Sequence, residues 1–262
     1  SGLVFEGGST TPPSDDEYID FLDQNTETLC VLNWDTDGDN KLSYAEAAAV
    51  ESVGTVFRGT NILSFDEFKY FTSVKKLEFQ AFFECKQLRK LTLPKSLEEL
   101  GQYSLTRLTS LKELVIPASV TVMNYELAAV CNSTLERLVV EEGNPVYDSR
   151  EGCNAIVETE TNSLIAGCKA TIIPESVTKI GAATFVCCSS LESIVVADGN
   201  PVYDSREGCN AIIETTTNTL IQGCKTTVIP ESVTEIGDDA FSGCASLESI
   251  TIPNSVTEIG KE

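Results

Sequence analysis

The chain contains no histidine, one tryptophan and one methionine among its 262 residues. The absence of histidine removes the side chain that enzymes use most often as a general base and as a transition-metal ligand, and it excludes every triad that depends on histidine. The many carboxylates lack an activated nucleophile beside them, so we interpret them as a solvated acidic surface. We therefore predict that the protein is not an enzyme.

Basic residues are also scarce, since 18 lysines and arginines stand against 40 aspartates and glutamates, for a formal net charge of −22. A chain this acidic repels phosphate backbones and anionic lipid headgroups, which argues against nucleic acid and direct membrane binding. No apolar run approaches the roughly 18 residues that span a bilayer, so we expect no transmembrane segment. Apolar residues make up 42% of the chain, as in an ordinary globular protein.

The two ends of the sequence carry separate expectations. Residues 1–15 are small, polar and proline-containing, and we predict that they form a flexible linker. The sequence begins with Ser1, so an export signal would lie before it. It ends at Glu262, part-way through a repeat unit, so we expect a terminal cap to be missing.

An internal duplication dominates the second half of the chain. Residues 138–193 and 194–249 align without gaps at an offset of 56 residues. A smaller unit, LESITIPNSVTEIG at 247–260, alternates apolar and polar residues and then stops at a proline, as a short strand does. The leading residue of this unit recurs at Val74, Leu88, Leu111, Leu135, Cys168, Leu191, Cys224 and Leu247. One short strand per unit cannot bury its face alone, so we predict a solenoid of stacked parallel strands, within an α+β protein.

Two of the units are ten residues longer than their neighbours. Apolar runs at 154–157 and 163–166, with polar residues between them, predict a β-hairpin, and the same pattern repeats at 210–222. We expect these hairpins to project as lobes from one side of the solenoid. The preceding YDSR segments, at 147–150 and 203–206, are interpreted as turns that close on themselves, with a contact patch as the alternative.

The unit IPESVTEIGDDAFSGCASLESI, at 229–250, resembles the leucine-rich repeats of bacterial surface proteins of the BspA type. The resemblance covers residues 74–262, although the repeats at 74–137 are degenerate. It implies an exported, cell-surface or extracellular protein, with a lipid anchor through a preceding segment as one option. It also implies adhesion and binding of host or bacterial surface proteins, and we expect a monomer. An accessory glycan-binding surface protein is the alternative, which the scarcity of tryptophan disfavours.

Residues 35–46, DTDGDNKLSYAE, place oxygen donors at the spacing of an EF-hand calcium loop. In such a loop three aspartates give carboxylates, the seventh residue its backbone carbonyl, the ninth a water-mediated contact and the twelfth both carboxylate oxygens. Hard oxygen ligands in this number suit Ca²⁺ better than Mg²⁺. The predicted ligands are Asp35, Asp37, Asp39, Lys41, Ser43 and Glu46. Asn40 replaces the usual glycine at the sixth position, and asparagine reaches positive φ more easily than most residues.

Segments 27–34 and 44–53 predict the two helices that flank this loop. Residues 56–67 have the same spacing without the first carboxylates, so we expect a second, empty loop that pairs with the first through Leu42 and Leu63. We predict an EF-hand-like helical module over residues 16–72 that caps a solenoid over residues 73–262. A calcium sensor is less favoured because sensors use a methionine-rich groove.

The ten cysteines include no CxxC pair, which argues against a zinc site. Cys85, Cys188 and Cys244 occupy the same slot of their repeats, and we expect them to fill an interior row as small apolar residues. Two other pairs bracket the predicted hairpins, and both free core thiols and disulfides remain open for them. These pairs are Cys153/Cys168 and Cys209/Cys224.

Overall fold

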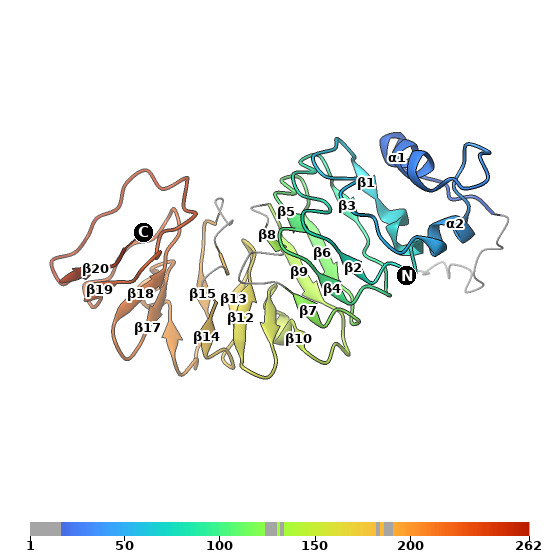
Figure 1. The fold of residues 1–262 in the computed structure, drawn as a ribbon. Coiled ribbons are helices and arrows are strands. Elements are labelled where there is room, and N and C mark those ends of the chain that lie inside the picture. The colour runs from blue at the N-terminus through green and yellow to red at the C-terminus, as the bar shows by residue number, and fades with distance from the viewer. Residues whose placement is uncertain (1–16, 124–129, 132–133, 182–183, 186–190, 262) are drawn as a thin grey trace, which may run out of the picture.

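The computed structural model describes residues 17–123, 130–131, 134–181, 184–185 and 191–261, so the predicted linker and Cys188 lie outside the described residues. Two short helices at one end lead into a stack of short strands that forms an elongated body (Figure 1). The strands of successive repeats pair in parallel, as the repeat pattern predicts. The chain is therefore a β-solenoid with few helices.

The structure differs from the prediction in the number of strands, because most repeats contribute at least two strands to separate ladders. The first ladder contains the pairs β1 (Ser64–Phe65) with β3 (Lys90–Leu91), β6 (Glu113–Ile116) with β9 (Arg137–Val140), and β13 (Ile172–Ile173) with β15 (Val195–Val196). The second contains β2 (Lys76–Leu77), β4 (Glu99–Leu100) and β7 (Val122–Met123), and later β14 (Lys179–Ile180), β19 (Glu235–Ile236) and β20 (Glu258–Ile259). A third pair joins β5 (Leu105–Thr106) to β8 (Val130–Cys131). Of the eight leading residues, all but Leu247 are buried.

In several units a glycine follows the last apolar residue of the second-ladder strand, and it permits a close approach between turns. The N–H of Gly101 donates to the carbonyl oxygen of Leu77 at 2.8 Å, and a Cβ built on Gly101 would lie 2.5 Å from that oxygen. No Cβ fits at that distance without a backbone shift. The same N–H bond to the preceding turn recurs at Gly181, Gly237 and Gly260.

Gly101→Ala is therefore expected to lower the free energy of unfolding by about 1–3 kcal/mol, because the new methyl group must displace the neighbouring turn. Gly237→Ala is the matched comparison, since its nearest atom would lie 3.2 Å away, and we expect a smaller loss there. Urea unfolding followed by circular dichroism measures both. Equal midpoints for Gly101→Ala and the parent would contradict the steric argument.

The predicted hairpins are present, but they do not project as lobes. Strands β11 (Ile156–Glu158) and β12 (Ser163–Ala166) pair antiparallel, and β12 then pairs in parallel with β14 of the solenoid. Leu164 and Val157 are fully buried, so the apolar residues of the insertion join the core instead of standing in solvent. The second copy repeats this with β17 (Ile212–Glu214), β18 (Thr219–Gln222) and β19.

Each YDSR segment closes on itself, as the interpretation of its sequence favoured. In the first copy, β10 (Tyr147–Asp148) leads into the 3-10 turn η3 (Arg150–Gly152). The Arg150 guanidinium donates to Asp148 at 2.8–3.0 Å and to Asn162 at 2.7 Å, which ties the turn to the hairpin. The second copy, β16 (Tyr203–Asp204) and η4 (Arg206–Gly208), repeats these bonds.

The flanking helices form close to their predicted bounds. Helix α1 (Gln24–Trp34) begins after Asp23, whose carboxylate accepts the Asn25 N–H at 3.1 Å and satisfies a free helical donor. Helix α2 (Tyr44–Ala49) begins with a capping box between Ser43 and Glu46, and it ends four residues before the predicted boundary. A 3-10 helix, η1 (Asp66–Tyr70), follows β1.

The predicted pairing of two EF-hand-like loops through Leu42 and Leu63 is wrong. The carbonyl oxygen of Leu42 accepts from Ile19, while the Leu63 N–H donates to Asp23 and the Leu63 carbonyl accepts from Arg89. The backbone groups of Leu63 are thus used by helix α1 and by the next repeat. Residues 56–67 contain β1, which pairs with β3 of the next repeat, and the start of η1, so they do not form a second loop of the calcium type.

A single hydrophobic core runs from Ile19 to Cys168, so the helices and the first repeats share one interior. Its densest part is a group of aromatic rings with no exposed surface, Phe57, Phe65, Phe68, Phe71 and Phe82. The helical end therefore covers the first turn of the solenoid as predicted for a cap, because repeat arrays need their end faces covered.

The cysteines that bracket the hairpins, Cys153, Cys168, Cys209 and Cys224, are buried free thiols. In the shared slot of the repeats, Cys85 is buried and Cys244 is partly buried. Burial raises the pKa of both Cys85 and Cys153 to about 11. Because the thiolate is the nucleophile, such thiols react slowly at neutral pH.

Iodoacetamide is thus expected to leave Cys85 and Cys153 unmodified in the native protein and to modify both after unfolding in urea. Mass spectrometry of the digested protein measures each site. Modification of either residue before unfolding would contradict the burial argument. A peptide pair joined by a disulfide would instead show that the hairpin cysteines bridge.

Candidate metal centre

The loop of residues 35–46 connects α1 to α2 at the helical end of the molecule (Figure 1). Asp35 is the C-cap of α1 and Ser43 is the N-cap of α2, so both ends of the loop are held by a helix. Asn40 has φ of 67°, which agrees with the positive φ expected where the usual glycine is replaced.

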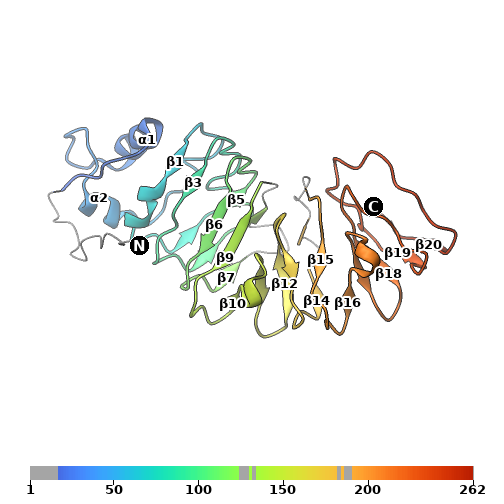
Figure 2. The ribbon, with the colours of Figure 1, turned by 180° about the vertical axis from the view of Figure 1, so that it is seen from behind.

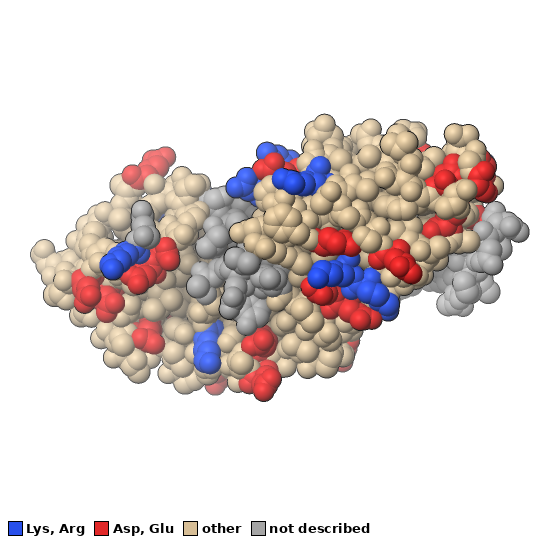
Figure 3. Space-filling view, viewed as in Figure 1, with Lys and Arg blue, Asp and Glu red and all other residues tan. Residues whose placement is uncertain are grey.

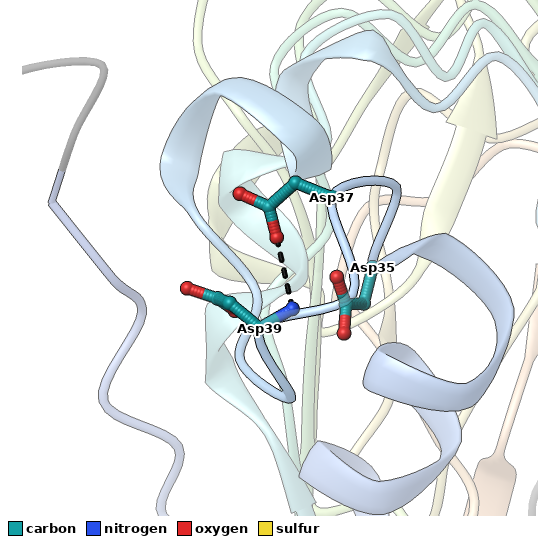
Figure 4. A group of neighbouring side chains, drawn as sticks. All are labelled: Asp35, Asp37 and Asp39. Atoms are coloured by element: carbon teal, nitrogen blue, oxygen red, sulfur yellow. Dashed lines mark hydrogen bonds between the residues drawn. The ribbon is translucent and has the colours of Figure 1, made fainter.

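Three carboxylates gather inside this loop. Oxygen atoms of Asp35, Asp37 and Asp39 lie within 4.8 Å of one another, and Figure 4 shows the side chains around the loop. The Asp35 carboxylate accepts the N–H of Gly38 at 2.7 Å, and the Asp37 carboxylate accepts the N–H of Asp39 at 3.0 Å. Backbone donors thus hold these side chains in place.

The charges of the three aspartates oppose one another. The backbone N–H of Asp39 lowers the pKa of Asp37, but desolvation and the charges of Asp39, Glu46 and Asp35 outweigh it. The pKa of Asp37 therefore lies above its ordinary value. Like charges held this close are stabilised when a cation binds between them.

Glu46 lies on the loop but outside the cluster of three aspartates. Its Oε1 accepts from the Thr36 N–H at 2.6 Å, and its Oε2 accepts from the Ser43 N–H at 2.9 Å. Burial alone would raise the pKa of Glu46, but the bonds from Ser43 and Thr36 lower it to about 2. Glu46 thus ties the two ends of the loop together.

The remaining predicted ligands occupy the same loop. The Ser43 hydroxyl donates to Glu46 at 2.9 Å, and the Lys41 ammonium lies 4.4 Å from the centroid of the Tyr18 ring. For Lys41 the predicted ligand is the backbone carbonyl and not this ammonium group. The loop supplies oxygen donors, the ligands that Ca²⁺ uses in proteins.

Sequence reasoning missed an aromatic surface on the first repeats. Phe79 is 51% exposed, and its ring lies 6.2 Å from that of Tyr103, which lies 6.4 Å from the ring of Phe83. The Arg107 guanidinium lies 5.4 Å from the Phe83 ring. Only tryptophan was counted as an aromatic residue for glycan binding, so these side chains were missed, although Phe79 and Phe83 lie on either side of the Ala81–Phe82 pair.

Over the part of the chain that the structure describes, no helix has the length and apolar character needed to cross a membrane.

The BspA type leucine rich repeat region matches the chain in six copies, over residues 54–147, 160–209 and 212–262. These matches cover most of the chain, and the protein belongs to this family of leucine-rich-repeat proteins. The first match begins at residue 54, inside the predicted module of residues 16–72 and ahead of β1. No curated protein matches the chain.

Several solved structures are similar to this chain. The pneumococcal vaccine antigen PcpA is 19% identical with a TM-score of 0.46, over 72% of this chain and 45% of that one. A leucine rich cell surface protein from Faecalibacterium prausnitzii is 22% identical with a TM-score of 0.36, over 72% and 48%. A leucine-rich repeat protein from Bacteroides ovatus is 21% identical with a TM-score of 0.28, over 73% and 46%. The chain spans about half the length of each of these proteins.

Proposed function

We propose that this chain is an exported or cell-surface bacterial protein that binds host or bacterial surface proteins through its solenoid, as an adhesion protein does. The observation that carries the proposal is the match of BspA type repeats over most of the chain. An elongated stack of short strands offers an extended surface, which is how repeat proteins bind their partners. No catalytic activity is part of this proposal.

A solid-phase assay with the purified chain tests this function. Immobilised extracellular matrix and intact neighbouring bacteria should bind the chain saturably. Treatment of these surfaces with protease should abolish binding, while treatment with periodate, which destroys sugar rings, should leave it unchanged. Absence of saturable binding to any surface would refute the proposal.

Glycan binding is the second candidate, and the aromatic surface of Phe79, Phe83 and Tyr103 is the observation that favours it. Exposed aromatic rings can stack on the apolar face of a sugar ring. The same large apolar area makes aromatic residues frequent at binding sites in general. Binding that resists protease, is lost after periodate and is weakened by Phe79→Ala would favour this candidate over protein binding.

We also propose that residues 35–46 hold one structural Ca²⁺ ion. The carboxylates of Asp35, Asp37 and Asp39 converge, and Glu46 lies close enough to bond both ends of the loop. An ion here would relieve the repulsion among the aspartates and would hold α1 and α2 against the first repeat. We favour a structural role over sensing because one core continues from these helices into the repeats.

A further inference from the structure

A groove of about 520 Å³ opens on the first ladder, between β3 and β6. Hydrogen bonds join β1 to β3 and β6 to β9, but among the described residues no strand pairing joins β3 to β6. The same repeats remain paired on the second ladder, where β2, β4 and β7 form one sheet. Figure 2 shows the first ladder, with β1, β3, β6 and β9 in order. At this point the strands of neighbouring repeats are therefore unpaired on the first ladder and paired on the second.

Basic side chains surround this groove, although the chain as a whole has a net charge of −22. Five basic and two acidic residues line it, namely Lys69, Arg89, Lys90, Lys95 and Lys112 with Glu113 and Glu141. Figure 3 shows the molecule from the side of Figure 1, opposite to the view of Figure 2, and there most basic side chains lie beside acidic ones.

The carboxylates near the groove do not balance these cations. Asp66 is shared by Lys69 at 3.3 Å and Lys90 at 2.9 Å. Glu136 is shared in the same way by Lys112 at 3.3 Å and by Lys169. Two lysines on one carboxylate leave a surplus positive charge in each case.

Arg89 adds to this surplus, since its guanidinium has no ion pair within the described part of the chain. Of the two acidic lining residues, Glu141 lies 4.0 Å from Lys95 and offsets that lysine, while Glu113 pairs with Arg137, which is not a lining residue. The positive potential of the groove is therefore not cancelled by its own carboxylates.

The floor of the groove is apolar. Leu91 and Leu93 are buried beneath it, and Val115 and Pro117 complete the lining from the β6 side. No aromatic ring is among the lining residues. An apolar floor below a cationic rim suits a chain that carries both apolar and acidic side chains.

We propose that this groove binds an extended acidic segment of a partner protein, an inference that rests on the proposed function and places its binding site. Carboxylates of the segment would meet the Arg89 and Lys112 side chains, while its apolar side chains would contact Leu91 and Val115. A uniformly charged anionic glycan fits less well, because the groove offers apolar floor, no stacking ring and two carboxylates. The net negative charge of the rest of the chain disfavours binding of such a segment elsewhere, so the groove sets its position.

The test compares two double variants that change the net charge equally. Arg89→Glu with Lys112→Glu reverses the rim of the groove, and both side chains are exposed, so the fold should be kept. Lys75→Glu with Lys76→Glu is the control, because these exposed lysines pair with Glu98 and Glu99 and do not line the groove. Thermal unfolding verifies that both variants fold.

The probe is a fluorescein-labelled peptide of alternating aspartate and leucine, and fluorescence anisotropy measures its binding to the full chain. We expect binding that weakens as salt is raised, about tenfold weaker binding by the groove variant, and affinity close to that of the parent in the control. A photo-reactive group on the peptide should label residues of the lining. Equal binding by the groove variant and the parent, or no binding by the parent, would overturn the inference.

Three further outcomes identify the occupant of the groove and separate this inference from the function on which it rests. If a heparin oligosaccharide binds with the same loss in the groove variant while the peptide does not bind, the occupant is an anionic glycan and the peptide inference is wrong. If the groove variant adheres to the protein-coated surfaces as well as the parent does, the groove inference fails and the proposed function stands. If the parent adheres to no surface, the proposed function itself fails.

Discussion

Replacing Phe65 by alanine is expected to lower the free energy of unfolding by about 3–5 kcal/mol, the largest effect of any substitution considered for this protein. Phe65 has no exposed surface and belongs to β1, the first strand of the solenoid. Its ring lies 4.8 Å from that of Phe57 and 5.0 Å from that of Phe68. Removing it leaves a cavity where the helical end meets the first repeats, and close-packed neighbours relax little into such a space.

Phe79→Ala is the matched control for this substitution. The same atoms are removed, but Phe79 is 51% exposed and less apolar surface returns to water. Urea unfolding followed by circular dichroism measures both variants, and we expect a midpoint shift at least twice as large for Phe65→Ala. Similar shifts for the two variants would show that the aromatic cluster is not the centre of the core.

Calcium at about 100 times its dissociation constant is expected to add near 2.7 kcal/mol to the free energy of unfolding, because it would bind the folded loop alone. Asp35→Asn and Glu46→Gln should each remove most of this gain, since each loses a ligand charge. Glu51→Gln lies just beyond helix α2 and outside the loop, and it should keep the gain in full. Calorimetric titration of the parent and the three variants measures the affinity.

Glu67→Gln provides a second comparison. Glu67 holds the position that corresponds to Glu46 in the segment 56–67, but its Oε1 accepts the Leu22 N–H at 3.0 Å and it lies on η1. We expect calcium affinity to be unchanged in this variant. Equal losses in Glu46→Gln and Glu67→Gln, or no calcium uptake by the parent at millimolar calcium, would refute the one-site proposal.

The stabilisation by calcium should also be local, because repeat arrays transmit energy mainly between neighbours. Hydrogen exchange with and without EDTA should show lost protection in α1, α2 and around Leu42 and Val74, and little change over residues 138–261. Uniform loss across the solenoid would contradict the capping role. Loss of partner binding in EDTA would place calcium at the binding surface.

The sequence alone determined the features that repeat or that depend on near neighbours. The gapless duplication predicts stacked parallel strands, since equivalent residues of successive units must meet at a fixed offset. The alternation at 154–166 predicts a hairpin, and both copies form one. The spacing of residues 35–46 likewise anticipated the convergence of three aspartates and the positive φ of Asn40.

The tertiary structure decided which backbone edges pair. Leu63 fits the eighth position of a second calcium-type loop, but its backbone bonds Asp23 and Arg89, which approach it through the stacking of the next turn and of α1. The hairpin strand β12 joins β14 because burying Leu164 is more favourable than leaving it in a solvated lobe. The local alternation of apolar and polar residues predicts that a strand forms, but it does not indicate which strand will pair with it.

The basic groove likewise depends partly on the sequence and partly on the tertiary structure. Arg89 and Lys112 directly follow Leu88 and Leu111, the leading residues of successive units, so the repeat register already places them on neighbouring turns, although it does not show that a groove opens between them. They line one site because the first ladder is open between β3 and β6 while the second stays paired. The sum of charges is a property of the sequence, but where charges of one sign meet depends on the stacking of the repeats, since stacking sets which turns lie side by side.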